Sequence, residues 1–226
     1  MKRAVLTRVS LHTAVLCFGL GGLVAAASSS PAIDRVLAAV PDAQHGEILY
    51  LKHCPACHGR HAWGDGPRAI PALAGQHESY LIEQLTDFAT AVRPGDSMHE
   101  VMRRTDLDWP QAVRDLSAYL SKAPRSRAPE IGENSNAGPG RTLYLQACST
   151  CHGVNGAGQA EGAPAIGGQQ YRYLLARIRN FSSTHRERVP SPWAGREASE
   201  QQLEGIADFI SRLRALVAAN EAGDDR

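Results

Sequence analysis

The sequence predicts an all-α protein that consists of two tandem copies of one helical module, and three observations support this fold class. First, residues 46–54 (GEILYLKHC) match residues 140–148 (GRTLYLQAC) at a constant offset, which indicates an internal duplication. Second, apolar residues recur at intervals of three and four after each copy, as on one face of a helix. Third, no segment alternates apolar and polar residues as a half-buried strand would.

The duplication continues along the chain and sets the predicted domain boundaries. Residues 71–76 (PALAGQ) match residues 164–169 (PAIGGQ). Between the copies lies a polar segment with several Pro, Ser and Gly residues, which is typical of a linker. The sequence therefore predicts a first domain over residues 41–123, a linker over 124–138 and a second domain over 139–216.

Each copy is expected to contain the same order of elements. A first helix leads into a Cys-x-x-Cys-His motif, a loop rich in glycine and proline follows, and two amphipathic helices close the copy. The apolar faces of these later helices are predicted at Leu81, Leu85, Phe88 and Val92 and at Val113, Leu116, Tyr119 and Leu120 in the first copy. In the second copy they are predicted at Tyr171, Leu174, Ile178 and Phe181 and at Leu203, Ile206, Phe209 and Ile210.

The two Cys-x-x-Cys-His motifs point to a cofactor. Cys54, Cys57 and His58 form the first motif, and Cys148, Cys151 and His152 form the second. This spacing is the attachment signature of c-type haem, in which two thiols hold one porphyrin and the adjacent histidine ligates its iron. A single Cys-x-x-Cys could instead be a redox dithiol or half of a zinc site. Two copies, each followed at once by His-Gly, favour two covalently bound haem c groups.

The N-terminus predicts export. Lys2, Arg3 and Arg8 precede an apolar run over residues 11–27 that ends in three alanines, which is the pattern of a signal peptide cleaved after Ala27. An uncleaved anchor is the alternative, although the run is shorter than the roughly 20 residues that a membrane span needs. Once residues 1–27 are removed, the remaining cysteines are the four of the two motifs, so none is left for a disulfide or a catalytic thiol.

Charge excludes one class of partner. The formal net charge is +1 and becomes about −2 once the three basic residues of the signal segment are removed, which argues against nucleic acid as a partner. Residues 41–123 hold eight Lys/Arg and eleven Asp/Glu, a net of −3, whereas residues 139–216 hold nine and six, a net of +3. This difference is either ordinary surface variation or a dipole that orients the protein on charged redox partners.

These motifs resemble the dihaem cytochrome c4 family, which has two class I cytochrome c domains in tandem. The resemblance covers about residues 41–216 and is most specific in the paired Cys-x-x-Cys-His-Gly motifs and the Pro-Ala-x-x-Gly-Gln segments. It implies a periplasmic electron carrier, often working towards terminal oxidases. It also implies that the carbonyls of Pro71 and Pro164 accept hydrogen bonds from the two proximal histidines, which orients the histidines as ligands.

The resemblance further implies a methionine as the sixth iron ligand in each domain. Beyond Met1 the chain has only Met98 and Met102, both in the first copy. Met98 follows residues 93–96 (RPGD), where the family places its ligand, and Met102 lies one helical turn later. We expect Met98 to be the ligand of the first iron, with Met102 as the alternative.

The second copy departs from this pattern because it has no methionine. Met98 falls opposite residues 188–191, in a stretch without a good neutral ligand for iron. Three interpretations stay open: an open or water-occupied position, ligation by His185, or a ligand from elsewhere in the chain. His45, His77 and His99 are expected at the surface.

The leading hypothesis is an electron carrier rather than an enzyme, moving electrons between redox proteins such as a quinol-oxidising complex, a dehydrogenase or a terminal oxidase. Membrane contact is expected only through these partners. One alternative is a haem enzyme or ligand-binding protein that uses an open sixth position on the second iron. Another is the cytochrome subunit of a larger dehydrogenase or oxidase complex.

Overall fold

The structure is a computed structural model that describes residues 30–93, 97–103, 107–133, 137–159, 162–183 and 198–223. The predicted signal segment and His185 lie outside these residues. Within the described part of the chain, no helix is both long and apolar enough to cross a membrane.

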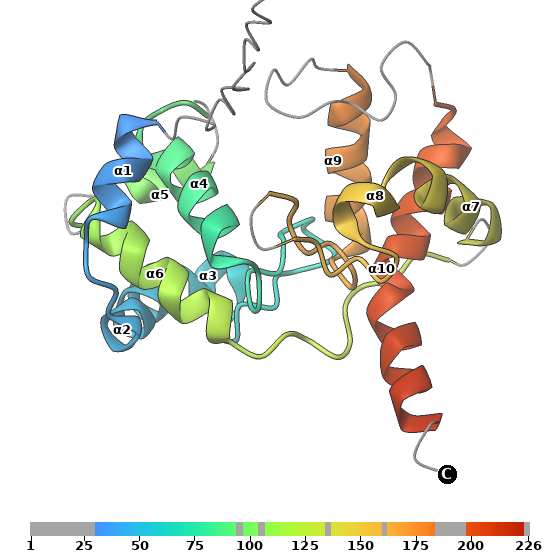
Figure 1. Cartoon of the computed structure of the whole chain (residues 1–226), viewed down its shortest axis with the longest axis horizontal. Helices are drawn as coiled ribbons and strands as arrows, with labels where there is room; N and C mark the ends of the chain where they lie inside the picture. Colours follow the sequence, from blue (N-terminus) through green and yellow to red (C-terminus); the bar gives the residue numbers. More distant parts are fainter. Residues whose placement is uncertain are drawn as a thin grey trace, which may run out of the picture.

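The described residues form helices and no strand, with one isolated bridge between Asp65 and Ile70, so the all-α prediction is confirmed. The two halves of the chain lie side by side (Figure 1). The first half contains α1 (Pro31–Leu37), α2 (Ala43–His53), α3 (Pro55–His58), α4 (Glu78–Ala89), α5 (Ser97–Met102) and α6 (Gln111–Lys122). The second contains α7 (Ala137–Ala147), α8 (Ser149–His152), α9 (Tyr171–Ser183) and α10 (Glu200–Gly223).

In the first half, which we call module one, the core lies where α2 crosses α6. Asp42 caps α2, because its carboxylate accepts hydrogen bonds from the backbone N–H groups of Gln44 and His45. Tyr50 on α2 is fully buried, packs against Tyr119 and donates its hydroxyl to the carbonyl of Gly59 in the loop that follows the Cys-x-x-Cys-His motif. This contact connects α2 to the start of the loop that follows the motif.

The second half, module two, repeats this arrangement with α7 crossing α10. Tyr144 on α7 is also fully buried, packs against Phe209 and donates its hydroxyl to the carbonyl of Gly153. The remaining core is apolar and lies mainly on α9 and α10: Leu174, Leu175, Leu203, Ile206, Ile210 and Leu213. The duplicated sequence thus builds the same helix crossing twice.

A glycine sits at each crossing because the two helix backbones approach too closely for any side chain. A Cβ on Gly46 would collide with the backbone carbonyl of Asp115 on α6. A Cβ on Gly140 would collide with the backbone carbonyl of Gly205 on α10. Since the obstacle in both cases is main chain, a rotamer change cannot relieve the collision.

Replacing Gly140 with alanine is therefore expected to lower the free energy of unfolding of the holoprotein by about 1–3 kcal/mol, the usual cost of forced overpacking. Gly138→Ala is the matched control, because it lies two residues away on the same helix and a Cβ there meets nothing within 4 Å. That variant is expected to be neutral or up to about 1 kcal/mol more stable, as alanine favours helix. Guanidinium unfolding followed by circular dichroism measures both, and equal effects would contradict the close crossing.

The segment between the modules contacts both of them. The indole N–H of Trp63 in module one donates to the carbonyl of Pro124 at 2.8 Å, and the guanidinium of Arg125 donates to the carbonyl of Gly167 in module two at 3.1 Å. Further along, the backbone N–H of Tyr171 donates to the carbonyl of Glu130 at 3.1 Å. The connection is thus hydrogen-bonded to module one at Pro124 and to module two at Arg125 and Glu130.

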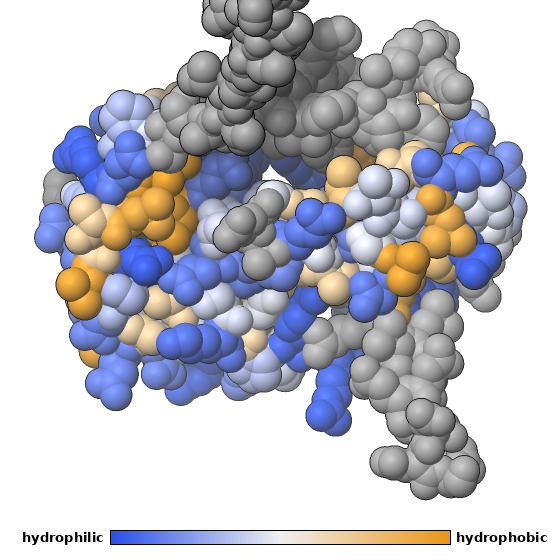
Figure 2. All heavy atoms as spheres, in the orientation of Figure 1, coloured by the Kyte–Doolittle hydropathy of each residue, from blue (hydrophilic) through white to orange (hydrophobic). Residues whose placement is uncertain are grey.

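The surface seen in Figure 2 is mostly hydrophilic, with separate apolar patches over each module. Among the described residues the exposed large apolar side chains are Leu37, Val40, Ile48, Leu51, Trp63, Val92, Ile131 and Val154.

Candidate functional site

Each Cys-x-x-Cys-His motif forms a single helical turn at the end of a longer helix. Cys54 ends α2 and begins α3, and the backbone N–H of His58 donates to the carbonyl of Cys54 at 3.0 Å. Cys148 and His152 make the equivalent bond at 3.0 Å in module two. This turn brings both cysteines and the histidine of a motif close together. None of these four cysteines is paired with another in a disulfide.

The two histidines are held in one tautomer by carbonyl groups. Nδ1 of His58 lies 3.0 Å from the carbonyl oxygen of Pro71, and Nδ1 of His152 lies 2.9 Å from that of Pro164. Because a carbonyl can only accept, Nδ1 carries the proton and Nε2 of the neutral ring keeps its lone pair for a metal. Burial lowers the pKa of both histidines, opposed by these hydrogen bonds, and so favours the neutral form that ligates iron.

Both motifs open into the same space. A cavity of about 1420 Å³ lies between the modules and is lined by all four motif cysteines and by His58 and His152. Its other walls are largely apolar and come from both modules, including Leu81, Leu85, Leu116, Leu120, Leu174, Ile206 and Ile210. Thiol pairs, imidazole nitrogens and apolar walls are the groups that two covalently attached haems require, so the residues present fit this cofactor.

The cysteines do not fit the redox-dithiol use of this motif. Burial raises the pKa of the Cys54 thiol to about 12 and that of Cys148 to about 11. Redox-active Cys-x-x-Cys pairs need the opposite shift, because the thiolate is the nucleophile. Across the described residues, no group of three or more His, Cys, Asp or Glu side chains is placed to hold a metal ion by itself.

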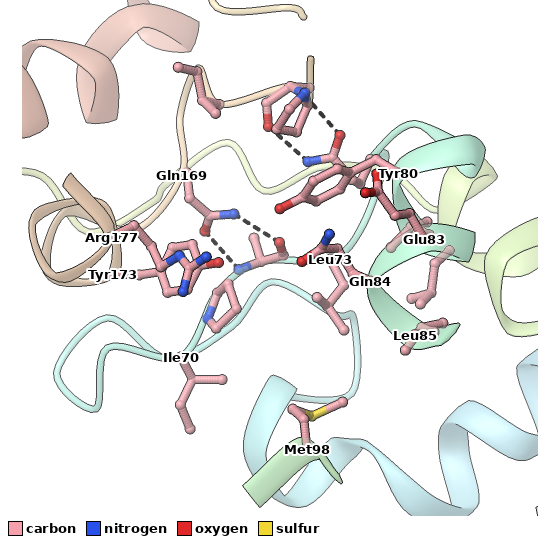
Figure 3. Close-up of a pocket in the computed structure, with 18 of the residues that line it drawn as sticks. Ile70, Leu73, Tyr80, Glu83, Gln84, Leu85, Met98, Gln169, Tyr173 and Arg177 are labelled. Atoms are coloured by element: carbon pink, nitrogen blue, oxygen red, sulfur yellow. Dashed lines mark hydrogen bonds between the residues drawn. The ribbon is translucent and has the colours of Figure 1, made fainter. Parts of the chain in front are cut away.

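The two methionines of module one both line the cavity from α5. Met98 is partly exposed and is labelled in Figure 3, whereas Met102 is only 5% exposed and belongs to the core cluster with Leu85 and Leu116. His99, between them, is buried at 8% exposure, and its Nδ1 lies 2.6 Å from the carbonyl oxygen of Phe88. The prediction that His99 is a surface residue is therefore wrong, because its ring is fixed against the end of α4.

The residues expected on the corresponding side of module two lie outside the described part of the chain. His185 and the stretch of residues 186–193, which were considered for the second sixth ligand, all lie in the undescribed segment. The absence of methionine from residues 103–226 is a property of the sequence and stands without the structure.

Two glutamines that the sequence reasoning passed over join the modules beside the proximal histidines. Gln76 of module one forms two hydrogen bonds with the backbone of Ala165, and Gln169 of module two forms two with the backbone of Ala72. Figure 3 draws the two bonds of Gln169 as dashed lines, near Tyr173 and Arg177 of α9. The sequence marks both glutamines as equivalent positions, since each ends a copy of the repeated Pro-Ala-x-x-Gly-Gln segment.

The other two surface predictions had mixed outcomes. His45 keeps a side chain that is 48% exposed, but its Nδ1 lies 2.8 Å from the carboxylate of Asp115. His77 remains partly exposed and its Nε2 lies 2.8 Å from the carbonyl oxygen of Ala157 in module two. Neither histidine is among the residues that line the cavity.

Comparison with known proteins agrees with this geometry. The cytochrome c family model matches residues 43–124 and again residues 137–214. Cytochrome c4 of Thiocapsa roseopersicina is 30% identical over 187 residues, which are 77% of this chain and 94% of the relative. A thiosulfate dehydrogenase electron acceptor of Thiomonas intermedia (strain K12) is 31% identical over 146 residues, covering 61% of this chain and 66% of that protein.

Among solved structures, reduced recombinant cytochrome c4 from Pseudomonas stutzeri superimposes with a TM-score of 0.64 at 27% identity, covering 76% of this chain and 98% of the other. The duplicated helical modules, the paired motifs and this likeness over nearly the full length of cytochrome c4 agree with one another. The chain belongs to the dihaem cytochrome c4 family of electron-transfer proteins, with two covalently bound haem c groups.

Proposed function

We propose that this cytochrome is a periplasmic electron carrier that takes electrons from a dehydrogenase or a quinol-oxidising complex and delivers them to a terminal oxidase or another respiratory acceptor. The observation that carries the proposal is the shared cavity, into which both motifs open with both proximal histidines fixed in the ligating tautomer. The predicted signal peptide over residues 1–27 supports the periplasmic location.

Each position that the two motifs share has one task in this function. Cys54 and Cys57 hold the first haem and Cys148 and Cys151 the second, over domains that we place at residues 41–123 and 139–216 with a linker at 124–138. His58 and His152 ligate the two irons through Nε2. The bound iron supplies a reversible one-electron couple, so no acid–base group and no consumed substrate is required.

The protein's contribution is to fix the ligands and to exclude water. Pro71 and Pro164 hold the imidazole rings in place, and the apolar walls from α4, α6, α9 and α10 keep a low dielectric around the irons.

A dehydrogenase of a small sulfur anion is the donor that the comparisons favour. The relative from Thiomonas intermedia is described as the electron acceptor of thiosulfate dehydrogenase and is 31% identical to this chain. We therefore propose thiosulfate dehydrogenase as the first donor to test.

The test mixes the oxidised holoprotein with catalytic amounts of thiosulfate dehydrogenase and thiosulfate without oxygen. The wild-type protein is expected to show two haems per chain by pyridine haemochrome and to take up two electrons. The variant with Cys148→Ala and Cys151→Ala is expected to keep one covalent haem and take up one electron, because the second motif can no longer hold its porphyrin. Two covalent haems in that variant would contradict the attachment sites. A holoprotein that dithionite reduces but the dehydrogenase does not would exclude this donor.

A further inference from the structure

Each module places one buried glutamine against the proximal loop of the other module. The backbone N–H of Ala72 donates to Oε1 of Gln169 at 2.8 Å, and Nε2 of Gln169 donates to the carbonyl of Ala72 at 2.9 Å. Gln76 makes the same pair of bonds with Ala165, both at 2.9 Å. Both side chains are nearly inaccessible, at 8% exposure for Gln76 and 6% for Gln169. Figure 3 shows Gln169 reaching across to the loop of module one.

The peptide groups that these glutamines bind are the ones that hold the proximal histidines. The N–H of Ala72 and the carbonyl of Pro71 belong to one peptide unit, and that carbonyl oxygen lies 3.0 Å from Nδ1 of His58. In module two the N–H of Ala165 shares a peptide unit with the carbonyl of Pro164, which lies 2.9 Å from Nδ1 of His152. Each proximal histidine is thus two hydrogen bonds away from a side chain of the opposite module.

Hydrogen bonds that are linked in series through a peptide group strengthen one another. A peptide whose N–H donates to an acceptor carries more negative charge on its carbonyl oxygen, by a cooperative effect of roughly 10–30% per bond. The oxygen then draws the Nδ1 proton of the histidine more strongly, and the imidazole becomes a better electron donor at Nε2. A better donor stabilises ferric over ferrous iron and lowers the reduction potential.

The orientation of each glutamine is fully determined. Oε1 of Gln76 also accepts from the N–H of His77 at 2.9 Å, and Oε1 of Gln169 also accepts from the N–H of Gln170 at 2.9 Å. Because one partner of the cross-module pair is a donor and the other an acceptor, the amide oxygen must face the N–H of the alanine. The polarising group is therefore held in place from both modules.

We propose that Gln76 and Gln169 are positioning residues that lower the reduction potential of the haem in the opposite module, so that docking of the modules tunes both redox centres. The inference rests on the haem attachment of the proposed function. It predicts a crossed pattern, in which a change in module two acts on the first haem and a change in module one acts on the second.

The structure provides a matched control in the neighbouring residue. Gln170 is also a buried glutamine between the modules, with Nε2 donating to the carbonyl of Trp63 at 2.6 Å and Oε1 accepting from the N–H of Glu130 at 2.6 Å. It touches neither proximal peptide. If the glutamines served only to hold the modules together, Gln170→Leu would affect the haems as Gln169→Leu does.

The experiment is a redox titration of the holoprotein followed by NMR, in which the two haems give separate signals. We expect Gln169→Leu to raise the potential of the first haem, Gln76→Leu to raise that of the second, and Gln170→Leu to raise neither. The Nδ1 proton of His58 in the reduced Gln169→Leu protein should also move upfield and exchange faster with solvent. Gln169→Glu, which keeps the acceptor and is isosteric, should lower the potential of the first haem, and it decides the question if the leucine variant does not fold.

The inference is overturned if Gln169→Leu and Gln169→Glu leave the potential of the first haem unchanged, if their main effect falls on the second haem, or if Gln170→Leu produces the same shift. Counting the haems per chain first distinguishes a failure of the proposed function from a failure of this inference. A wild-type count below two per chain overturns the proposed function together with this inference. A count of two with unshifted potentials overturns the inference alone.

Discussion

Replacing Met98 with alanine is expected to remove the sixth ligand of the first haem and to lower its reduction potential by a large part of the roughly 0.8 V range that axial ligands span. Met98 lies on the cavity wall, partly exposed, at the start of α5. A thioether stabilises ferrous iron, so the loss of the sulfur removes a stabilisation that the ferric state does not share. Redox titration gives the potential, and the weak red band of ferric methionine-ligated haem, which should vanish, gives the ligand.

Met102→Ala is the control because the same side chain is lost one helical turn away. Met102 is 5% exposed within the core cluster of module one, so its truncation should cost about 2–5 kcal/mol of stability while leaving the red band in place. The reverse pattern, with the band lost in Met102→Ala and kept in Met98→Ala, would assign the ligand to Met102. If the red band persists in both variants, thioether ligation is ruled out in this chain.

The helical spacing of apolar residues in the sequence predicted many of the side chains that are buried in the two cores. Leu81, Leu85 and Phe88 are buried as predicted, because they recur on one face of α4 and that face packs against the cavity and α6. Val92 is 54% exposed, because α4 ends at Ala89 and the helical periodicity does not extend to it. Apolar spacing predicts a buried face only where the helix itself continues.

The sequence also contains a local start signal for helix α1, which the sequence analysis did not predict. Helix α1 begins at Pro31, and the hydroxyl of Ser30 caps it by accepting from the N–H of Ile33. Serine followed by proline is a common helix start, since proline has the backbone angle of the first turn and needs no N–H partner there. Only seven residues follow, too few for the periodicity that identified the longer helices.

The contacts between the modules could not be predicted from the sequence, because no local pattern encodes them. Gln76 and Ala165 are 89 residues apart, and Gln169 and Ala72 are 97 apart. Each pair forms only after both modules have folded and docked. The repeat showed that the two glutamines occupy equivalent positions, but not that each binds the partner module. The burial of His99 was missed for the same reason, because its partner is a carbonyl at the end of another helix.

The second haem is expected to have the lower potential and to be the one that binds an external ligand. The chain has no methionine after Met102, so module two cannot supply a thioether to its iron. Without that sulfur the ferrous state loses its stabilisation, and an unfilled sixth position admits a small neutral ligand. Redox titration should show two separated steps, and carbon monoxide should bind to about one haem per chain.

His185→Ala distinguishes an open or water-occupied sixth position on the second iron from ligation by His185. If the sixth position of the wild-type protein is open or holds water, carbon monoxide binds before and after the substitution. If His185 ligates the iron, the wild-type protein is low-spin and binds carbon monoxide slowly, and only the variant gains rapid binding, because removal of the imidazole opens the position. Two equal high potentials without carbon monoxide binding in either protein would contradict the asymmetry. In that case a ligand from elsewhere in the chain must complete the second iron, and the protein would be a two-haem carrier with equivalent centres.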